Sequence, residues 1–290
     1  MKTKALSLAV AFGLGVAVLG MPGAADADSG LKAQIRSLDL IKESGELHVA
    51  VYNNYPPFSV NSNGTLQGID VDIAKALGKL LGLKVTFKEV PAGDSVDDDL
   101  RNAIWRGSFL DHSTADVMLH IPTDPKLSQT SDEVKIFGAY YKDQLAVAGD
   151  PDKFDADDGV EAFRDAKVGV ELATLADMVL MLTDKGALID NVRHYRSLEQ
   201  AVDGMDKGEV VAVMGVQSEL EGALGARRAK YPVTVMNLPK VAHSTWELGM
   251  AVDAGAPALA QVLSDGIATL IADGTIKKIF ADHGVDYVDP

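Results

Sequence analysis

The stretch that decides the fold covers residues 45–87, GELHVAVYNNYPPFSVNSNGTLQGIDVDIAKALGKLLGLKVTF. In residues 46–52 apolar and other side chains alternate, which is typical of a strand with one buried face. Residues 70–82 place their large apolar side chains on one helical face and carry acidic residues in the first turn, so they predict a helix. Residues 84–90 predict a second strand. The order strand, loop, helix, strand is the repeating unit of an α/β fold.

The rest of the chain continues this alternation. Further strands are predicted at residues 116–121, 143–149 and 247–252, with helical patterns between them. The chain opens with a short amphipathic pattern from Leu31 to Ile41 and closes with two helices. Such alternation predicts a mostly parallel sheet covered by helices on both faces.

Composition excludes several classes of protein. The 290 residues include no cysteine, so disulfides, a thiolate metal site and a cysteine nucleophile are all excluded. The formal net charge of −15 argues against a nucleic acid as partner. The sequence shows no phosphate-binding loop, no serine-nucleophile elbow and no histidine pair with metal-ligand spacing. We therefore expect a protein that is not an enzyme and that has neither a metal ion nor a cofactor.

The first residues predict a signal peptide. Lys2 and Lys4 precede the apolar run of residues 5–19, and AADA, ending at Ala27, is a small-residue cleavage pattern. The run is shorter than the roughly 20 residues that span a bilayer, although a membrane anchor stays an alternative. Without a cysteine the protein has no place for a lipoprotein anchor. We expect residues 1–27 to be removed and the mature chain to work in the periplasm, without a membrane span.

Four pieces, in this order, resemble one known family. They are the opening stretch of residues 45–87, ADVMLHIPTD with KIFGAYYKDQLAVA, AKVGVELATLADMVL, and ALAQVLSDGIATLIADGTIKKIFADHG. Together they are similar to the family 3 extracellular solute-binding proteins, the receptors of polar amino-acid importers. The resemblance implies a bilobed type II periplasmic binding fold of two α/β lobes, usually monomeric. It places lobe 1 at residues 28–145 and 250–290, and lobe 2 at 146–249.

The same resemblance implies two hinge strands and a ligand cleft between the lobes. The hinges are expected near Gln144–Ala148 and Leu248–Val252. The expected ligand-binding residues lie at strand ends, in loops and at helix starts: Asn54, Tyr55, Phe58, His120, Pro122, Asp124, Lys126, Thr174 and Gln217.

Each of these residues also has a simpler interpretation. Tyr55 and Phe58 suit plain packing, His120 suits a satisfied histidine at a strand end, and Thr174 suits a helix N-cap. As a ligand group, Thr174 at a helix start would favour an anion. Asp70 is expected to cap its helix. An acid–base pair of His120 and Asp124 is conceivable, but two neighbouring polar residues are weak evidence for catalysis.

The chain departs from the amino-acid receptors at both ends of their ligand clamp. The arginine that grips the α-carboxylate is expected among Lys126, Leu127 and Ser128, and none of these is arginine. The aspartate that takes the α-ammonium group is replaced by Val216 and Gln217. Loss of buried charged partners weakens binding strongly, so we expect weak or no binding of ordinary amino acids.

A sub-branch of the family matches these departures. The phrase DLRNAIWRG, followed by ADVMLHIP, resembles binding proteins associated with PQQ-dependent quinoprotein alcohol dehydrogenases. Two functions stay open: a receptor for a small polar solute that serves an ABC permease, and a partner of such a dehydrogenase with a repurposed or vestigial cleft. A receptor should bury converging polar groups in its cleft, whereas a partner should expose an apolar patch outside it.

Overall fold

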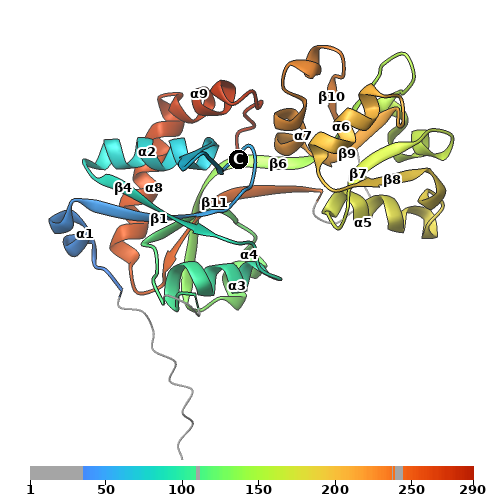
Figure 1. The fold of residues 1–290 in the computed structure, drawn as a ribbon. Coiled ribbons are helices and arrows are strands. Elements are labelled where there is room, and N and C mark those ends of the chain that lie inside the picture. The colour runs from blue at the N-terminus through green and yellow to red at the C-terminus, as the bar shows by residue number, and fades with distance from the viewer. Residues whose placement is uncertain (1–34, 109–111, 237, 239–243) are drawn as a thin grey trace, which may run out of the picture. The chain divides into compact units, whose positions relative to one another are not determined.

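The computed structural model describes residues 35–108, 112–236, 238 and 244–290, which all belong to one compact unit, Lys32–Pro290 (Figure 1). The predicted signal peptide lies outside the described residues. None of the described helices has the length and apolar character that crossing a membrane requires.

The first group of elements is built as the opening stretch predicts. The strand predicted at residues 46–52 is confirmed as β1, and it pairs in parallel with β4 on one side and with β5 on the other. The predicted helix of residues 70–82 is α2, which starts and ends one residue earlier, with Gly82 as its C-cap. The elements of this group are α1 (Leu38–Ser44), β1 (Glu46–Tyr52), β2 (Val60–Ser62), β3 (Thr65–Gln67), α2 (Ile69–Leu81), β4 (Lys84–Val90), α3 (Val96–Leu100), a π-helical turn (Arg101–Trp105), β5 (Val117–Pro122) and α4 (Pro125–Thr130).

The second group follows β6 (Val134–Gly149) in the chain. Its parallel strands β7, β8 and β9 have helices between them, and β10 is an additional strand beside β6. The elements are a 3₁₀ segment (Ala156–Arg164), β7 (Val168–Glu171), α5 (Leu175–Leu182), 3₁₀ turns (Thr183–Lys185 and Ile189–Asn191), β8 (Val192–Tyr195), α6 (Leu198–Asp206), β9 (Ala212–Val216), α7 (Gln217–Leu224), a 3₁₀ turn (Gly225–Ala229) and β10 (Val233–Val235). The chain returns through β11 (Thr245–Asp253), α8 (Pro257–Ala272) and α9 (Thr275–Asp282).

One strand, β6, belongs to both groups. Residues 134–144 pair with β11, and residues 145–149 pair with β9 and β10. Figure 1 shows β6 passing from the first group of elements into the second. The sheet order β4-β1-β5-β11-β6-β9-β7-β8 follows from this change of partner. The predicted strand of residues 143–149 is thus only the second part of a strand of 16 residues.

Two sets of apolar side chains form separate cores. In the first, Val49 and Leu119 of the sheet pack with Ile73 of α2 and Leu263 of α8. In the second, side chains from β7, α5 and β9 pack on one face of the sheet, and side chains from α6 and α7 on the other. Each set belongs to one of the two groups of elements.

Three details differ from the expectations. The sheet is mixed and not mostly parallel, because β6 pairs in antiparallel fashion with β11, β9 and β10, and β11 also does so with β5. The first helix begins at Leu38, because the Ser37 side chain accepts a hydrogen bond from the Leu40 N–H and caps it there. Residues Leu248–Val252, expected near a hinge, lie within the first core, where Leu248 pairs with Pro122 of β5.

A buried tyrosine fixes the end of β5 to its surroundings. The Tyr140 hydroxyl donates to Asp70 Oδ1 at 2.8 Å and accepts from the His120 N–H at 3.0 Å. Tyr140 and Asp70 are 0% exposed. The neighbouring Tyr141 is equally buried, but its hydroxyl has no hydrogen-bond partner in the described chain. Of two adjacent buried tyrosines in β6, the hydroxyl of Tyr140 is therefore hydrogen-bonded and that of Tyr141 is not.

This contrast gives a matched pair of substitutions. Tyr140→Phe should lower the free energy of unfolding by about 2–3 kcal/mol, because it leaves a buried carboxylate oxygen and a buried N–H without a partner. Tyr141→Phe should change it by less than about 0.5 kcal/mol or raise it, because no bond is lost. Urea unfolding of both variants measures the difference. Equal losses would show that the Tyr140 hydroxyl does not hold β5.

Candidate functional site

The loop after β1 carries an aromatic pair. The rings of Tyr55 and Phe58 stack with centroids 5.7 Å apart. The Tyr55 N–H donates to the Ser59 carbonyl at 2.7 Å, and the Ser59 hydroxyl donates to the Tyr52 carbonyl. These bonds tie the loop back to the end of β1. Phe58 is completely buried, which agrees with the packing role that is the simpler interpretation of its sequence position.

His120 brings the tip of β5 to these rings. Its ring centroid lies 4.2 Å from Phe58 and 5.0 Å from Tyr55, both edge to face, and 6.2 Å from Tyr52. The backbone at His120 has a φ of 64°, a left-handed conformation that is uncommon outside glycine. Such strain persists where surrounding contacts hold it, and here Tyr140 binds the His120 N–H.

Beneath His120 two buried polar atoms face each other. His120 Nδ1 and Asp70 Oδ2 are 3.2 Å apart, but neither makes a well-aligned hydrogen bond. Asp70 is not the N-cap of α2 as expected, because Gly68 takes that place with a φ of 136°. A side chain at Gly68 would meet the Phe58 carbonyl at 2.2 Å, so only glycine fits there. The Asp70 carboxylate is thereby free to face inward, toward Tyr140 and His120.

Glu219 meets Tyr55 from the other group of elements. The Tyr55 hydroxyl donates to Glu219 Oε1 at 2.5 Å. Glu219 is the third residue of α7, whose start follows directly on β9. Burial, together with the nearby carboxyls Asp143 and Glu171, raises the pKa of Glu219 to about 7. Glu219 is not among the residues predicted from sequence, because the resemblance implies an acid only at Val216 and Gln217.

Asp143 lies where β6 changes partners. It is 1% exposed, and its carboxylate accepts hydrogen bonds from the Ser218 hydroxyl at 2.5 Å and from the N–H groups of Ser218 and Gln144. Burial raises the pKa of Asp143 in spite of these donors. The start of α7 is thus bonded directly to the crossing strand.

The start of α5 is already occupied by the chain itself. Thr174 is its N-cap: the Thr174 hydroxyl accepts from the Asp177 N–H at 3.3 Å and donates to the Glu171 carbonyl at 2.8 Å. The Asp177 carboxylate accepts from the Ala173 N–H at 2.9 Å and contacts His194 Nε2 at 2.9 Å. A carboxylate of the protein therefore sits where Thr174 was expected to favour an anion.

The structure brings together only some of the predicted site residues. Tyr55, Phe58 and His120 form one cluster. The Gln217 amide is engaged by Gln144 at 2.8 Å and by Glu221 at 3.0 Å, so it joins α7 to β6. The remaining predicted residues lie elsewhere. Pro122 pairs with Leu248 in the sheet, and Asp124 is the N-cap of α4. Lys126 in α4 and Asn54 in the loop after β1 are exposed.

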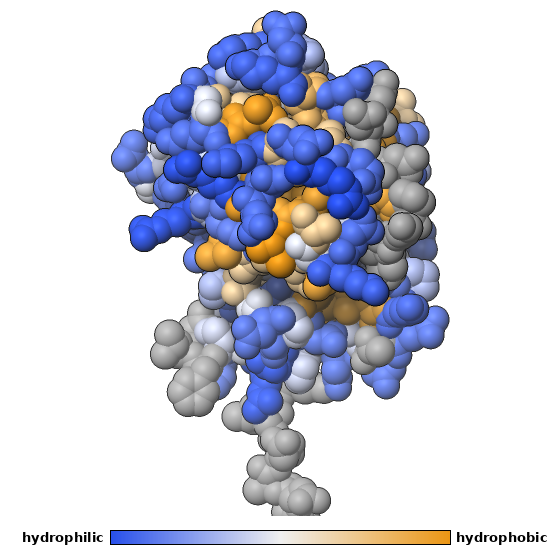
Figure 2. Space-filling view, turned by 90° about the vertical axis from the view of Figure 1, so that its right-hand side faces the viewer, coloured by the Kyte–Doolittle hydropathy of each residue, from blue (hydrophilic) through white to orange (hydrophobic). Residues whose placement is uncertain are grey.

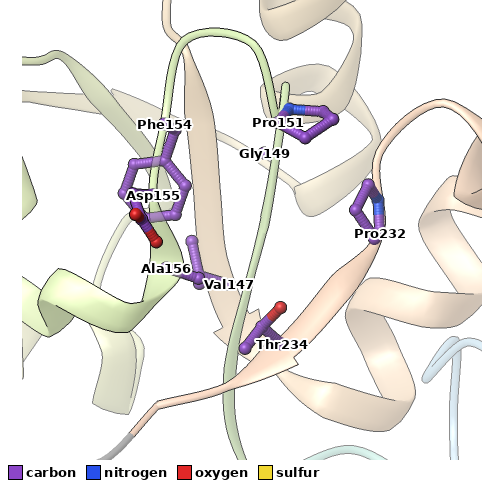
Figure 3. A pocket seen from close by; sticks show the side chains of 8 residues that line it. All are labelled: Val147, Gly149, Pro151, Phe154, Asp155, Ala156, Pro232 and Thr234. Atoms are coloured by element: carbon purple, nitrogen blue, oxygen red, sulfur yellow. The ribbon is translucent and has the colours of Figure 1, made fainter.

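A cavity of about 340 Å³ lies apart from this cluster, near the far end of β6 (Figure 3). Figure 3 shows Phe154 and Asp155 on one side of it and Pro232 and Thr234 on the other. None of the predicted site residues lines this cavity. Among the described residues no group of three or more histidine, aspartate or glutamate side chains is placed to hold a metal ion.

Comparison with solved structures defines the fold. The chain has the type II periplasmic binding fold, a bilobed α/β architecture. An ancestral cationic amino acid solute-binding protein superposes with a TM-score of 0.67 at 23% identity, over 85% of this chain and 98% of that one. A polar amino acid ABC uptake transporter substrate-binding protein from Streptococcus thermophilus has the same TM-score at 14% identity, over 87% and 91%.

The sequence comparisons agree with this fold. Residues 47–103 match the bacterial extracellular solute-binding proteins, family 3. The L-cystine-binding protein TcyJ of Escherichia coli strain K12 is 25% identical over 269 residues, which are 90% of this chain and 89% of that protein. A shorter match of 60 residues, 45% identical, links 20% of this chain to the cyclohexadienyl dehydratase of Pseudomonas aeruginosa.

The raised pKa of Glu219 has a consequence for stability. The folded protein holds this proton more tightly than the unfolded chain, so the stabilisation is present at low pH and is lost as pH rises from about 4.5 to about 7. Above that range Glu219→Gln should raise the free energy of unfolding by up to about 3 kcal/mol, and at pH 4 it should leave it nearly unchanged.

Denaturant unfolding at pH 4 and pH 8 measures both values. Glu199→Gln is the control, because Glu199 is an exposed glutamate of α6. A gain for Glu219→Gln that is the same at both pH values would contradict the raised pKa.

Proposed function

We propose that the mature chain is a periplasmic solute-binding receptor of family 3 that presents a small polar solute to an ABC permease. The observation that carries the proposal is the hydrogen bond from Tyr55 to Glu219. It joins a loop of the first core to a helix of the second, beside His120 and Asp143. Converging buried polar groups at strand ends are what a ligand site of this fold requires.

The signal peptide, residues 1–27, and the periplasmic location belong to the same proposal. They rest on the basic start, the apolar run and the AADA pattern. The family match of residues 47–103 and the alignment with an L-cystine-binding protein over 90% of the chain support a receptor role. A solute that touches both lobes binds the closed arrangement better and shifts the population toward it. The closed receptor then docks on the permease.

A thermal-shift screen of residues 28–290 tests the receptor role. A solute at 100 times its dissociation constant should add about 2.7 kcal/mol of stability, which is roughly 5 °C or more in Tm. Tyr55→Ala should remove this shift, because it removes both the ring beside His120 and the bond to Glu219. Glu199→Gln should keep it. A hit whose shift survives Tyr55→Ala would place the solute elsewhere.

A second function is favoured by a different observation. Of the eight large apolar residues that are exposed in the described chain, four lie on or beside α5: Leu172, Met178, Leu182 and Ile189. Figure 2 shows apolar side chains gathered near the middle of the face that the second group of elements presents, within a hydrophilic rim. An exposed apolar patch favours a protein partner. The alternative proposal is therefore an accessory protein of a periplasmic PQQ-dependent alcohol dehydrogenase.

Binding of such a dehydrogenase gives the test. Met178→Ser and Leu182→Ser should each weaken the complex about tenfold, because each removes apolar area from the contact. Leu80→Ser is the matched control, since Leu80 is 46% exposed but lies in α2. Surface plasmon resonance measures the affinities. An unchanged dehydrogenase activity and no binding would exclude this alternative.

A further inference from the structure

The charged groups around Glu219 are mainly acidic. Asp143 and Glu171 act on its carboxyl with the same charge, and His120 acts with the opposite one. Burial and the charges of Glu219, Asp143 and Asp70 raise the pKa of the Tyr55 hydroxyl beside it. Asp70 is 0% and Asp143 is 1% exposed, so water screens these charges little. An anion placed here would meet several carboxyls and a single imidazole.

Most of these carboxyls already have donors from the chain. Asp143 accepts three hydrogen bonds, Asp70 accepts the Tyr140 hydroxyl, and Glu171 accepts the Leu198 N–H at 3.1 Å. Glu219, like Asp70 and Glu171, accepts on one oxygen only: Oε1 accepts from Tyr55, and no hydrogen bond within the described chain reaches Oε2. Glu219 Oε2, next to the Tyr55 hydroxyl, is thus left for a donor from outside.

A second observation indicates an incomplete polar site at this place. Asp70 Oδ2 and His120 Nδ1 are buried 3.2 Å apart, neither makes a well-aligned hydrogen bond, and the His120 ring lies against Tyr55 and Phe58. Buried polar atoms without partners are rare in native proteins and usually mark a functional group or an absent ion or solute. The alternative place for an anion, the start of α5, is filled by Asp177.

We propose that the solute is an organic nitrogen cation without a carboxylate, an amine or a guanidine, whose N–H groups donate to Glu219 beside the Tyr55 ring. This rests on the receptor function proposed above and names its class of solute. The aromatic face of Tyr55 adds attraction for a cation. The absence of an arginine at Lys126, Leu127 and Ser128 fits a solute that has no carboxylate to bind.

Matched pairs of solutes test the proposal by calorimetry at pH 8. Agmatine and cadaverine differ from arginine and lysine only by lacking the carboxylate. Each should bind at least tenfold more tightly than its amino acid, and Glu219→Gln should weaken agmatine at least about 30-fold. Glu199→Gln, the control, should leave the affinity unchanged.

The dependence on pH gives an independent readout. The groups that face Glu219 are Tyr55 from the loop after β1, His120 from β5, Asp143 from β6 and Glu171 from β7. Because Glu219 must be ionised to bind a cation, affinity for agmatine should rise about tenfold from pH 6 to pH 8. Glu219→Gln should remove most of this rise.

The outcomes separate the two proposals. Tighter binding of arginine or lysine than of their decarboxylated partners, or binding of succinate or another organic anion, overturns the cation proposal and keeps the receptor. An affinity that falls between pH 6 and pH 8 also overturns it. If none of the amines, amino acids and organic anions binds, the receptor function is overturned, and the cation proposal with it.

Discussion

The unbroken course of β6 is the constraint on which the rest of the structure depends. Its first part pairs with β11 beside one core, and its second part lies between β9 and β10 in the other, with the change at Gln144 and Leu145. Asp143 and Gln144 hold Ser218 and Gln217 at the start of α7. The position of α7 is therefore linked to the strand that carries both cores.

Much of the fold could be predicted because its information is local. Alternation in residues 46–52 and the helical stripe of residues 70–82 depend only on neighbours in the chain, and both are confirmed. The first part of β6 escaped prediction for a physical reason. Tyr140 and Tyr141 are both completely buried, and Gly138 has a φ of 65°, so the pattern of period two is broken there. The register of β11 against β6 shifts at the same place.

The candidate site was predictable only in part, because its chemistry depends on contacts between distant residues. Tyr55, Phe58 and His120 stand at strand ends and in a loop, where a pattern can find them. Glu219 stands 164 positions after Tyr55, and only the fold shows that they meet. An acidic residue in the first turn of the helix after β9 was the available signal. The resemblance implies an acid at Val216 or Gln217, and Glu219 lies two residues after Gln217.

The side chains at the site, and not the fold, determine which solute this chain can bind. A shared architecture fixes where a solute can lie, whereas side chains decide which solute is bound. In this chain Asp177 fills the start of α5, and Glu219 adds a carboxyl opposite Tyr55. Both carboxyls move the balance of charge toward the negative side. Because buried like charges destabilise one another, such an arrangement is retained at a cost to stability unless a positive partner compensates it. His120 supplies one imidazole against Asp70, and the remaining compensation must come from a proton on Glu219 or from a bound cation.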